Sequence, residues 1–252
     1  MDRTQDVIVD VRSPAGTCHI GTLTAETNFN FQVRPGQIVG FLEARNSTFL
    51  FRLILGLGTL STGTIDFPSL DHLRKNENFY INFGLAQREK GLLSNLNILE
   101  NVELPARYHN IKVGELGPDE LTHKALREAI IPENFWNLRP DHIPWEIKKR
   151  TILARAVVCL PKIVLLEDPT NMFRWEKLPE LFHWIKLQQT EKRATLLCTE
   201  NIPFALSICD SVWNAETQKL ETVDQYLEEK GTEWSTFITQ MRKQLEVSCV
   251  ST

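Results

Sequence analysis

The chain has 252 residues, a formal net charge of −4, 42% hydrophobic residues and 24% charged residues. This length is ample for one sizeable domain, and the composition is that of an ordinary globular protein. No basic cluster stands out, which argues against nucleic acid as a partner, and no apolar run approaches the about 18 residues of a transmembrane helix. Five scattered cysteines without metal-binding spacing indicate reduced thiols and a cytoplasmic protein.

The first part of the chain favours β-structure. Residues 6–42 contain two alternating apolar and polar stretches, VIVDV and NFNFQV, which predict antiparallel strands. Residues 34–37 (RPGQ) are typical of a turn, and the apolar run that follows fits a buried strand. The polar stretch 43–48 then predicts a loop, and the apolar residues 49–57 predict a buried helix that ends near Gly56.

The rest of the chain alternates helical patterns with apolar strands. Helices are predicted within 92–130, where Pro105 breaks the run, and at 146–160, 178–193 and 203–209, with strands at 162–169 and 194–201. This alternation predicts the α/β class, with a parallel sheet covered on both faces. An amphipathic C-terminal segment predicts a helical tail that packs either on its own domain or on a neighbouring subunit.

Five segments, in this order, resemble those of ATP-binding-cassette (ABC) ATPases. They are FNFQVRPGQIVGF, FLFRLILGLGTLSTGTIDF, FGLAQREKGLLSNLNILENVELPARYH, KKRTILARAVVCLPKIVLLEDPT and TLLCTENIPFALSICDSVW. The resemblance covers about residues 6–215 and is closest to the phospholipid and lipoprotein-export branches. It implies an ABC-ATPase-like P-loop core with a parallel sheet, an N-terminal antiparallel β section and a helical subdomain. The expected domains are a nucleotide-binding-like domain at 1–222, with its helical subdomain at about 88–150, and a helical tail at 223–252.

The phosphate loop of this family is not kept. The family pattern G-x-x-x-x-G-K-[ST] cradles phosphates with backbone N–H groups, a lysine and a hydroxyl that holds Mg²⁺. Here residues 42–48 read LEARNST, without glycine or lysine, and the loop is about two residues short. Ser47 or Thr48 stands at the hydroxyl position, and Arg45 either replaces the lysine or is a solvated arginine.

Of three other polar positions of the family site, one is kept and two are exchanged with each other. Gln87 stands at the Q-loop position, where the family glutamine contacts Mg²⁺ or the attacking water, although a plain surface glutamine is the alternative. The Walker B pair is reversed to Glu167-Asp168, so the resemblance places Glu167 at the magnesium position and Asp168 at the general base. A base must come within about 2.6–3.2 Å of its water, so changed side-chain lengths matter. The resemblance thus implies Thr48, Gln87 and Glu167 as the magnesium positions.

The positions that contact ATP from a second subunit are replaced as well. Residues 143–147 read IPWEI at the signature, where Trp145 and Glu146 replace two glycines, and we expect Trp145 to pack locally. Arg174 stands for the D-loop aspartate, and Glu200 stands for the switch histidine. Because the family site joins the phosphate loop of one subunit to the signature of the other, both halves are affected.

The sequence therefore favours a catalytically degenerate ABC-type nucleotide-binding subunit, a pseudo-ATPase, of a lipid-related membrane transport complex. Its expected partners are a membrane permease, docked through residues 87–105, and a second ABC-type subunit in a homo- or heterodimer. The expected location is cytoplasmic, peripheral to the inner (plasma) membrane. No cofactor is expected, with weak binding of ATP and Mg²⁺ left open. The alternatives are a residually active ATPase subunit that uses Asp168 and a cytosolic interaction scaffold without a transport role.

Overall fold

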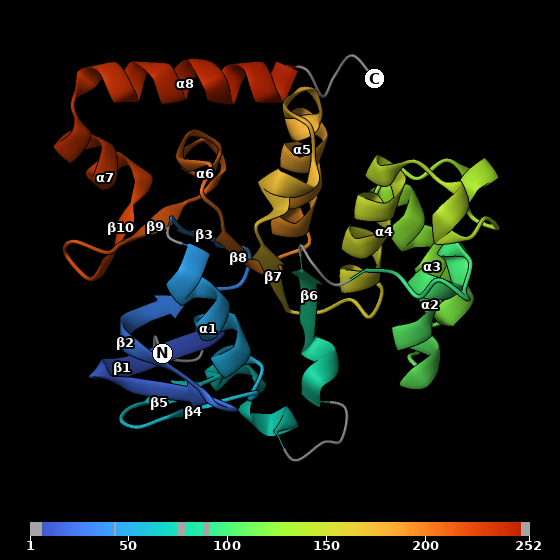
Figure 1. Cartoon of the computed structure of the whole chain (residues 1–252), viewed down its shortest axis with the longest axis horizontal. Helices are drawn as coiled ribbons and strands as arrows, with labels where there is room; N and C mark the ends of the chain where they lie inside the picture. Colours follow the sequence, from blue (N-terminus) through green and yellow to red (C-terminus); the bar gives the residue numbers. More distant parts are fainter. Residues whose placement is uncertain (1–6, 43, 75–78, 88–90, 248–252) are drawn as a thin grey trace.

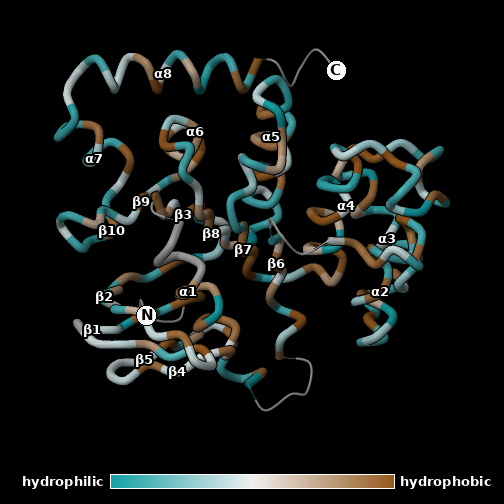
Figure 2. The backbone as a smooth tube through the Cα atoms, viewed as in Figure 1, coloured by the Kyte–Doolittle hydropathy of each residue, from teal (hydrophilic) through white to brown (hydrophobic). Residues whose placement is uncertain are grey.

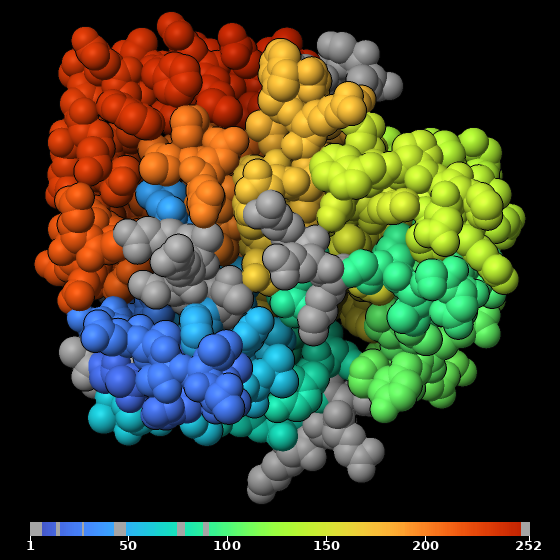
Figure 3. Space-filling model, in the orientation of Figure 1, coloured from blue at the N-terminus to red at the C-terminus, as the bar shows by residue number. Residues whose placement is uncertain are grey.

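The computed structural model describes residues 7–42, 44–74, 79–87 and 91–247, without the side chains of residues 14, 15, 27 and 44–48. Within these ranges two sheets lie one above the other, and a group of helices stands beside them (Figure 1). The space-filling view shows the helices within residues 98–157, coloured green to yellow-green, as a lobe at one side of the molecule (Figure 3).

The smaller sheet is the antiparallel section that the sequence predicts. It contains β1 (Val9–Ile20), β2 (Leu23–Val33), β4 (Thr59–Leu60) and β5 (Thr64–Asp66). The strand order is β2-β1-β4, and β5 also pairs with β1. In the β1–β2 ladder Val9 pairs with Val33 and Val11 with Phe31, and all four side chains are buried. One face of this sheet therefore belongs to the core.

The larger sheet has the order β10-β9-β3-β8-β7-β6. Its strands are β3 (Ile38–Phe41), β6 (Phe83–Gln87), β7 (Ile163–Glu167), β8 (Ala194–Cys198), β9 (Ser211–Asn214) and β10 (Lys219–Thr222). The pairs from β9 to β6 are parallel, and β10 is antiparallel to β9. Hydrophobic residues colour these central strands and α1 in Figure 2. The predicted α/β class with a parallel sheet is confirmed.

Both faces of the larger sheet are buried, and successive residues of its strands serve different cores. On β7, Ile163 and Leu165 pack with the antiparallel sheet and with α1 (Ala44–Ile54), whereas Val164 and Leu166 pack on the other face. The helices on that other face include α5 (Leu178–Thr190) and α6 (Ile202–Ile208). This two-sided burial explains why the strand reads as a continuous apolar run.

The lateral lobe consists of helices that the sequence places only approximately. It contains α2 (Ile98–Tyr108), α3 (Pro118–Glu128) and α4 (Trp145–Val157). Pro105 lies inside α2 instead of breaking it. A proline lacks a backbone N–H, but its carbonyl can still accept a hydrogen bond. Here the N–H of His109, at the C-terminal end of α2, donates to the Pro105 carbonyl at 3.1 Å.

The C-terminal tail packs on its own domain. It forms α7 (Val223–Lys230) and α8 (Thr232–Val247), and α8 lies against α5 and α6. Ile238 and Leu245 of α8 are buried, and Arg242 donates from Nε to the Ser207 carbonyl at 2.9 Å. This contact satisfies a carbonyl in the last turn of α6.

The cysteines of the described residues are not paired in disulfides. In the described chain Cys18, Cys159, Cys198 and Cys209 are free, and all except the half-buried Cys159 are buried. Burial raises the pKa of Cys159 to about 11, so this thiol stays protonated at neutral pH. None of the described helices has both the length and the apolar character needed to cross a bilayer.

Candidate functional site

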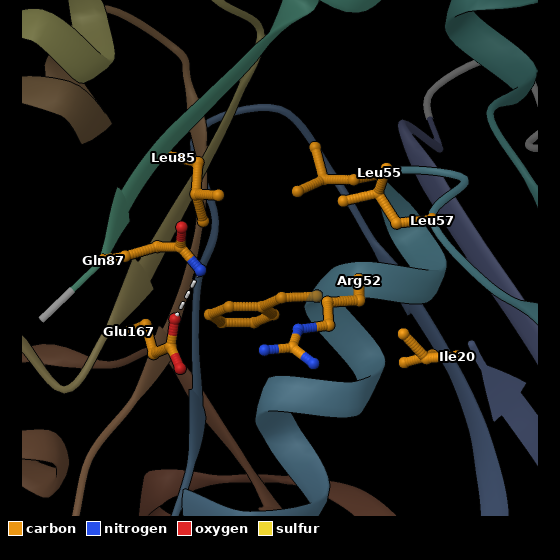
Figure 4. Close-up of a pocket in the computed structure, with 8 residues that line it drawn as sticks. Ile20, Arg52, Leu55, Leu57, Leu85, Gln87 and Glu167 are labelled. Atoms are coloured by element: carbon orange, nitrogen blue, oxygen red, sulfur yellow. Dashed lines mark hydrogen bonds between the residues drawn. The ribbon is translucent and has the colours of Figure 1, made fainter. Parts of the chain in front are cut away.

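The structure brings two of the predicted site residues into contact. Gln87 ends β6 and Glu167 ends β7, and the two residues are partners in the parallel β6–β7 ladder. Gln87 donates from Nε2 to Glu167 Oε2 at 3.0 Å, as the dashed line in Figure 4 shows. The carboxyl edge of the larger sheet thus carries an amide and a carboxylate that are already hydrogen-bonded to each other.

Asp168, the predicted general-base position, follows directly and is buried. Its backbone is left-handed, at φ 50° and ψ 51°, a region that aspartate tolerates better than most side chains. Its N–H donates to the Cys198 carbonyl at 2.8 Å, which ties the end of β7 to β8. Asn171 donates from Nδ2 to Asp168 Oδ2 at 2.6 Å. The carboxylate that would act as a base is therefore already bound by a neighbouring amide.

A cavity of about 210 Å³ lies beside the Gln87–Glu167 pair. Figure 4 shows this pair on one side and residues of α1 and the segment after it on the other. The lining residues are Ile20, Phe51, Arg52, Leu55, Leu57, Leu85, Gln87 and Glu167. The cavity is thus mostly apolar and has one cation, one amide and one carboxylate in its walls.

The end of α1 positions the far wall of this cavity. The Gly56 N–H donates to the Leu53 carbonyl at 2.9 Å, and the Leu57 N–H donates to the Arg52 carbonyl at 2.8 Å. Gly56 has φ +69°, the left-handed conformation of a Schellman motif. The predicted helix end at Gly56 is confirmed. By stopping the helix here, the motif leaves Leu57 62% exposed at the cavity.

The connection between β3 and α1 is short. β3 ends at Phe41 and α1 begins at Ala44, so only residues 42 and 43 join them. The expected loop over 43–48 is therefore wrong, because the helix begins within that stretch. The predicted phosphate-binding residues Arg45, Ser47 and Thr48 fall in the first turns of α1, and their side chains lie outside the described part of the structure.

The positions that face a second subunit in the family all lie at the surface or beside it. Trp145 begins α4 and is 45% exposed, with Lys149 Nζ at 5.6 Å from its ring centroid. Local packing of Trp145 is thus limited, because nearly half of its surface remains accessible. Arg174 and Glu200 are exposed. Each follows a buried residue, Phe173 and Thr199, that anchors its loop.

Some residues around the site were missed by reasoning from the sequence. Arg52 and Leu57 line the cavity, and Asn101 is fully buried beneath the loop that leads into α2. A signal for Asn101 exists, since a lone asparagine within the apolar helical pattern ILENVEL indicates a buried hydrogen-bonding role. No sequence pattern indicates Arg52, because only the tertiary fold brings it to the same cavity as Glu167.

The described residues include few side chains that are placed to bind a metal ion together. In the ranges that the structure describes, no three His, Cys, Asp or Glu side chains are grouped so that they could hold one. Of the predicted magnesium positions, Gln87 donates from its amide nitrogen to Glu167, so its amide oxygen is the atom that could contact a cation. The side chain of Thr48 lies outside the described residues.

Comparisons with known proteins place the chain among transporter ATP-binding proteins. No family model matches it. It is 31% identical over 174 residues to the lipoprotein-releasing system ATP-binding protein LolD of Wigglesworthia glossinidia brevipalpis, covering 67% of this chain and 74% of that protein. An uncharacterized ABC transporter ATP-binding protein of Bacillus subtilis, YybJ, is 26% identical over 85% of this chain and 96% of its own length. The sulfate/thiosulfate import ATP-binding protein CysA of Nitrosomonas europaea is 26% identical, and the chain spans 57% of its length.

Solved structures show the same fold. The dimeric bacterial ABC transporter cassette MJ0796 aligns with a TM-score of 0.66 at 19% identity, over 81% of this chain and 93% of that one. CbiO1 of Clostridium perfringens, part of an ABC transporter complex, aligns with a TM-score of 0.72 at 19% identity, over 89% of this chain and 92% of that one. With its sequence relatives and its fold in agreement, the chain belongs to the family of ABC transporter ATP-binding proteins.

Proposed function

We propose that the chain is a catalytically degenerate ABC subunit of a membrane transport complex, which binds a permease without binding or hydrolysing ATP. The observation that carries this proposal is the connection of two residues between β3 and α1. A phosphate loop of the family pattern places about six residues before its lysine, so that backbone N–H groups can surround the phosphates. Neither the length nor the composition of residues 42–48 fits Mg-ATP.

The other positions of the site support the same proposal. Glu200 carries a negative charge on the loop after β8, at the edge where a triphosphate would lie, and Glu146 carries one at the signature position, which in the family faces the ATP of a second subunit. Asp168 accepts a hydrogen bond from Asn171 at Oδ2, which makes that oxygen a weaker base. Charge-assisted hydrogen bonds contribute about 1.5–3 kcal/mol each, and a site that lacks several of them loses most of its affinity.

The cavity beside Gln87 supports a docking role. It opens between α1 and β6, and Leu57 stands exposed in its wall. Leu93 and Leu104, within the predicted docking region 87–105, are exposed as well. Apolar side chains around a hollow suit an amphipathic helix from a partner. We assign this site to a cytoplasmic segment of the permease, which would place the chain at the cytoplasmic face of the membrane.

One of the relatives supports a cargo class. LolD is named for a lipoprotein-releasing system. That relative supports a lipid-linked cargo for the complex of this chain, handled by the permease and not by the chain itself. In this proposal a second ABC-type subunit completes the assembly.

The experiment is a membrane-recruitment assay with Leu57→Asp. Full burial of a leucine contributes about 1.5–3 kcal/mol, so the charged variant should bind membranes containing the permease at least about tenfold more weakly. The matched control is Phe237→Asp on α8, where a half-exposed apolar residue lies away from the cavity. Recruitment of Leu57→Asp equal to that of the control would reject the docking site and leave the interaction scaffold as the better account.

A further inference from the structure

Two carboxylates of the helical lobe share one arginine. Arg107 of α2 contacts Glu103 of the same helix, from Nε to Oε2, at 2.6 Å, and it contacts Asp119 of α3, from Nη2 to Oδ1, at 3.2 Å. Nε and Nη2 form one edge of the guanidinium, and such an edge frequently takes both oxygens of a single carboxylate. Here it is divided between two acids, so the carboxylates of Glu103 and Asp119 lie next to each other.

Glu103 is the buried member of this pair. Its side chain is only 5% exposed, and its Oε1 atom has no hydrogen-bond partner among the residues that the structure describes. A buried acceptor without a donor costs free energy, and the cost is larger for a charged carboxylate than for a neutral carboxyl. A protonated Oε1 instead carries a hydrogen that it can donate to Asp119. The geometry therefore favours a neutral Glu103.

Asp119 is the member that keeps its charge. Its side chain is 67% exposed and stands in the first turn of α3, where the end of the helix favours an anion. A hydrogen bond from Glu103 lowers the pKa of Asp119, and His123, one turn further along α3, acts in the same direction. Burial and the hydrogen bond to Asp119 raise the pKa of Glu103, and Arg107 opposes both. The two environments thus separate the acids, and the first proton is held on Glu103.

We propose that Glu103 and Asp119 form a shared-proton site, in which the proton of Glu103 joins α2 to α3 and makes the helical lobe sensitive to pH. At low pH the carboxyl of Glu103 donates to Asp119, whereas at high pH both acids are charged and repel each other across the two helices. Glu103 precedes Leu104, an exposed side chain of the region 87–105, so the site determines how firmly the docking helix is held. The inference rests on the proposed function only for this docking role.

The other groups at this site are limited. Within the described ranges, Arg107 and His123 are the additional charged or titratable side chains that act on the pair, and α4, which also packs on α2, contributes none. An imidazole titrates between about pH 5 and about pH 8, the same range as the proposed site. The test therefore compares proteins that all keep His123, so that its own titration cancels.

The test is urea denaturation of the wild-type chain and of Glu103→Gln between about pH 5 and about pH 8, without any partner. A glutamine keeps the shape and the donor of the neutral carboxyl but cannot ionise. Since folding raises the pKa of Glu103, the wild type loses stability relative to the variant as the pH rises through that pKa. We expect a folding equilibrium constant a few-fold larger for the variant at the upper pH, and a difference that shrinks as the pH falls. Hydrogen exchange of the α2 amides should also be slower in the variant at the upper pH.

Two further variants separate a shared proton from burial alone. Glu115→Gln makes the same change at an exposed position in the loop before α3 and should show no such pH dependence. In an Asp119→Asn background the second charge is gone and an amide can donate to Glu103, so the advantage of Glu103→Gln should be clearly smaller. An equal advantage in both backgrounds, or a Glu103→Gln variant no more stable than the wild type at the upper pH, would overturn the inference. Neither outcome bears on permease docking or on ATP.

Discussion

Asn101 is a fully buried polar residue that organises the loop between the candidate site and α2. Its Oδ1 accepts from the Leu93 N–H at 2.7 Å, and its Nδ2 lies 3.0 Å from the Leu93 carbonyl, 3.1 Å from that of Leu96 and 2.8 Å from that of Asn97. A single amide thus satisfies backbone groups that would otherwise lie beneath a turn without partners. The loop that precedes α2 is built around this one side chain.

We expect Asn101→Ala to lower the free energy of unfolding by about 2–3 kcal/mol, because several buried hydrogen bonds are lost at once. Urea denaturation followed by circular dichroism measures this change. Asn95→Ala is the matched control, since Asn95 is exposed in the same loop and its replacement should cost no more than about 0.5 kcal/mol. Equal stabilities of the two variants would show that Asn101 does not hold the loop.

At the scale of elements, a buried ion pair joins the helical lobe to the helices beside the sheet. Arg150 of α4 pairs with Glu180 of α5 and also donates from Nη1 to the Ile130 carbonyl at 3.0 Å. Lys177 Nζ lies 2.8 Å from the other Glu180 oxygen, Oε1. Burial lowers the pKa of the Arg150 guanidinium, so the arginine depends on its partners to stay buried in its charged form.

Glu180→Ala should therefore destabilise the chain by about 3–5 kcal/mol, because it leaves Arg150 buried without its carboxylate. The double variant Arg150→Met/Glu180→Leu should be clearly more stable than Glu180→Ala, since it buries no charge. Both are measured by urea denaturation. As a reference, Asp66→Ala breaks the exposed Arg74–Asp66 pair and should cost no more than about 1 kcal/mol. A double variant as unstable as the single one would refute the argument from burial.

The elements that the sequence predicts well are those with a long and uniform pattern. β7 and β8 are continuous apolar runs, and α5 is a long amphipathic helix. The pattern of apolar residues alone therefore predicts the secondary structure of these three elements. The β9–β10 hairpin was not predicted, because its short strands, SVWN and KLET, mix polar with apolar residues, unlike the apolar β3 of the same length. The start of α1 was misplaced because its polar first residues resemble a loop, while the packing of Leu50 and Ile54 extends the helix.

The candidate site was predictable only in part, for a physical reason. Gln87 and Glu167 could be placed together, because they end strands that the family resemblance makes neighbours. The hydrogen bond from Asn171 to Asp168 depends on a left-handed residue within a turn, and no sequence pattern indicates it. The cavity wall at Leu57 likewise depends on how the helix end meets β6, which is a tertiary property.

At the scale of the whole molecule, the chain has the fold of its family, whereas residues 42–48 differ from the family's phosphate loop. The order β10-β9-β3-β8-β7-β6, the antiparallel sheet and the helical lobe are in place. The segment between β3 and α1, where the family holds its phosphates, has two residues. In the proposal made above, this framework serves to hold a permease and a second subunit in position, and the energy for transport comes from elsewhere in the complex.

The most direct test of this account is isothermal titration of the full chain with Mg-ATP, with LolD as the positive control under the same conditions. The account predicts no saturable heat for this chain up to millimolar nucleotide, because the short connection and the missing lysine remove most of the phosphate contacts. Saturable binding with a micromolar dissociation constant would contradict it and would favour a residually active ATPase.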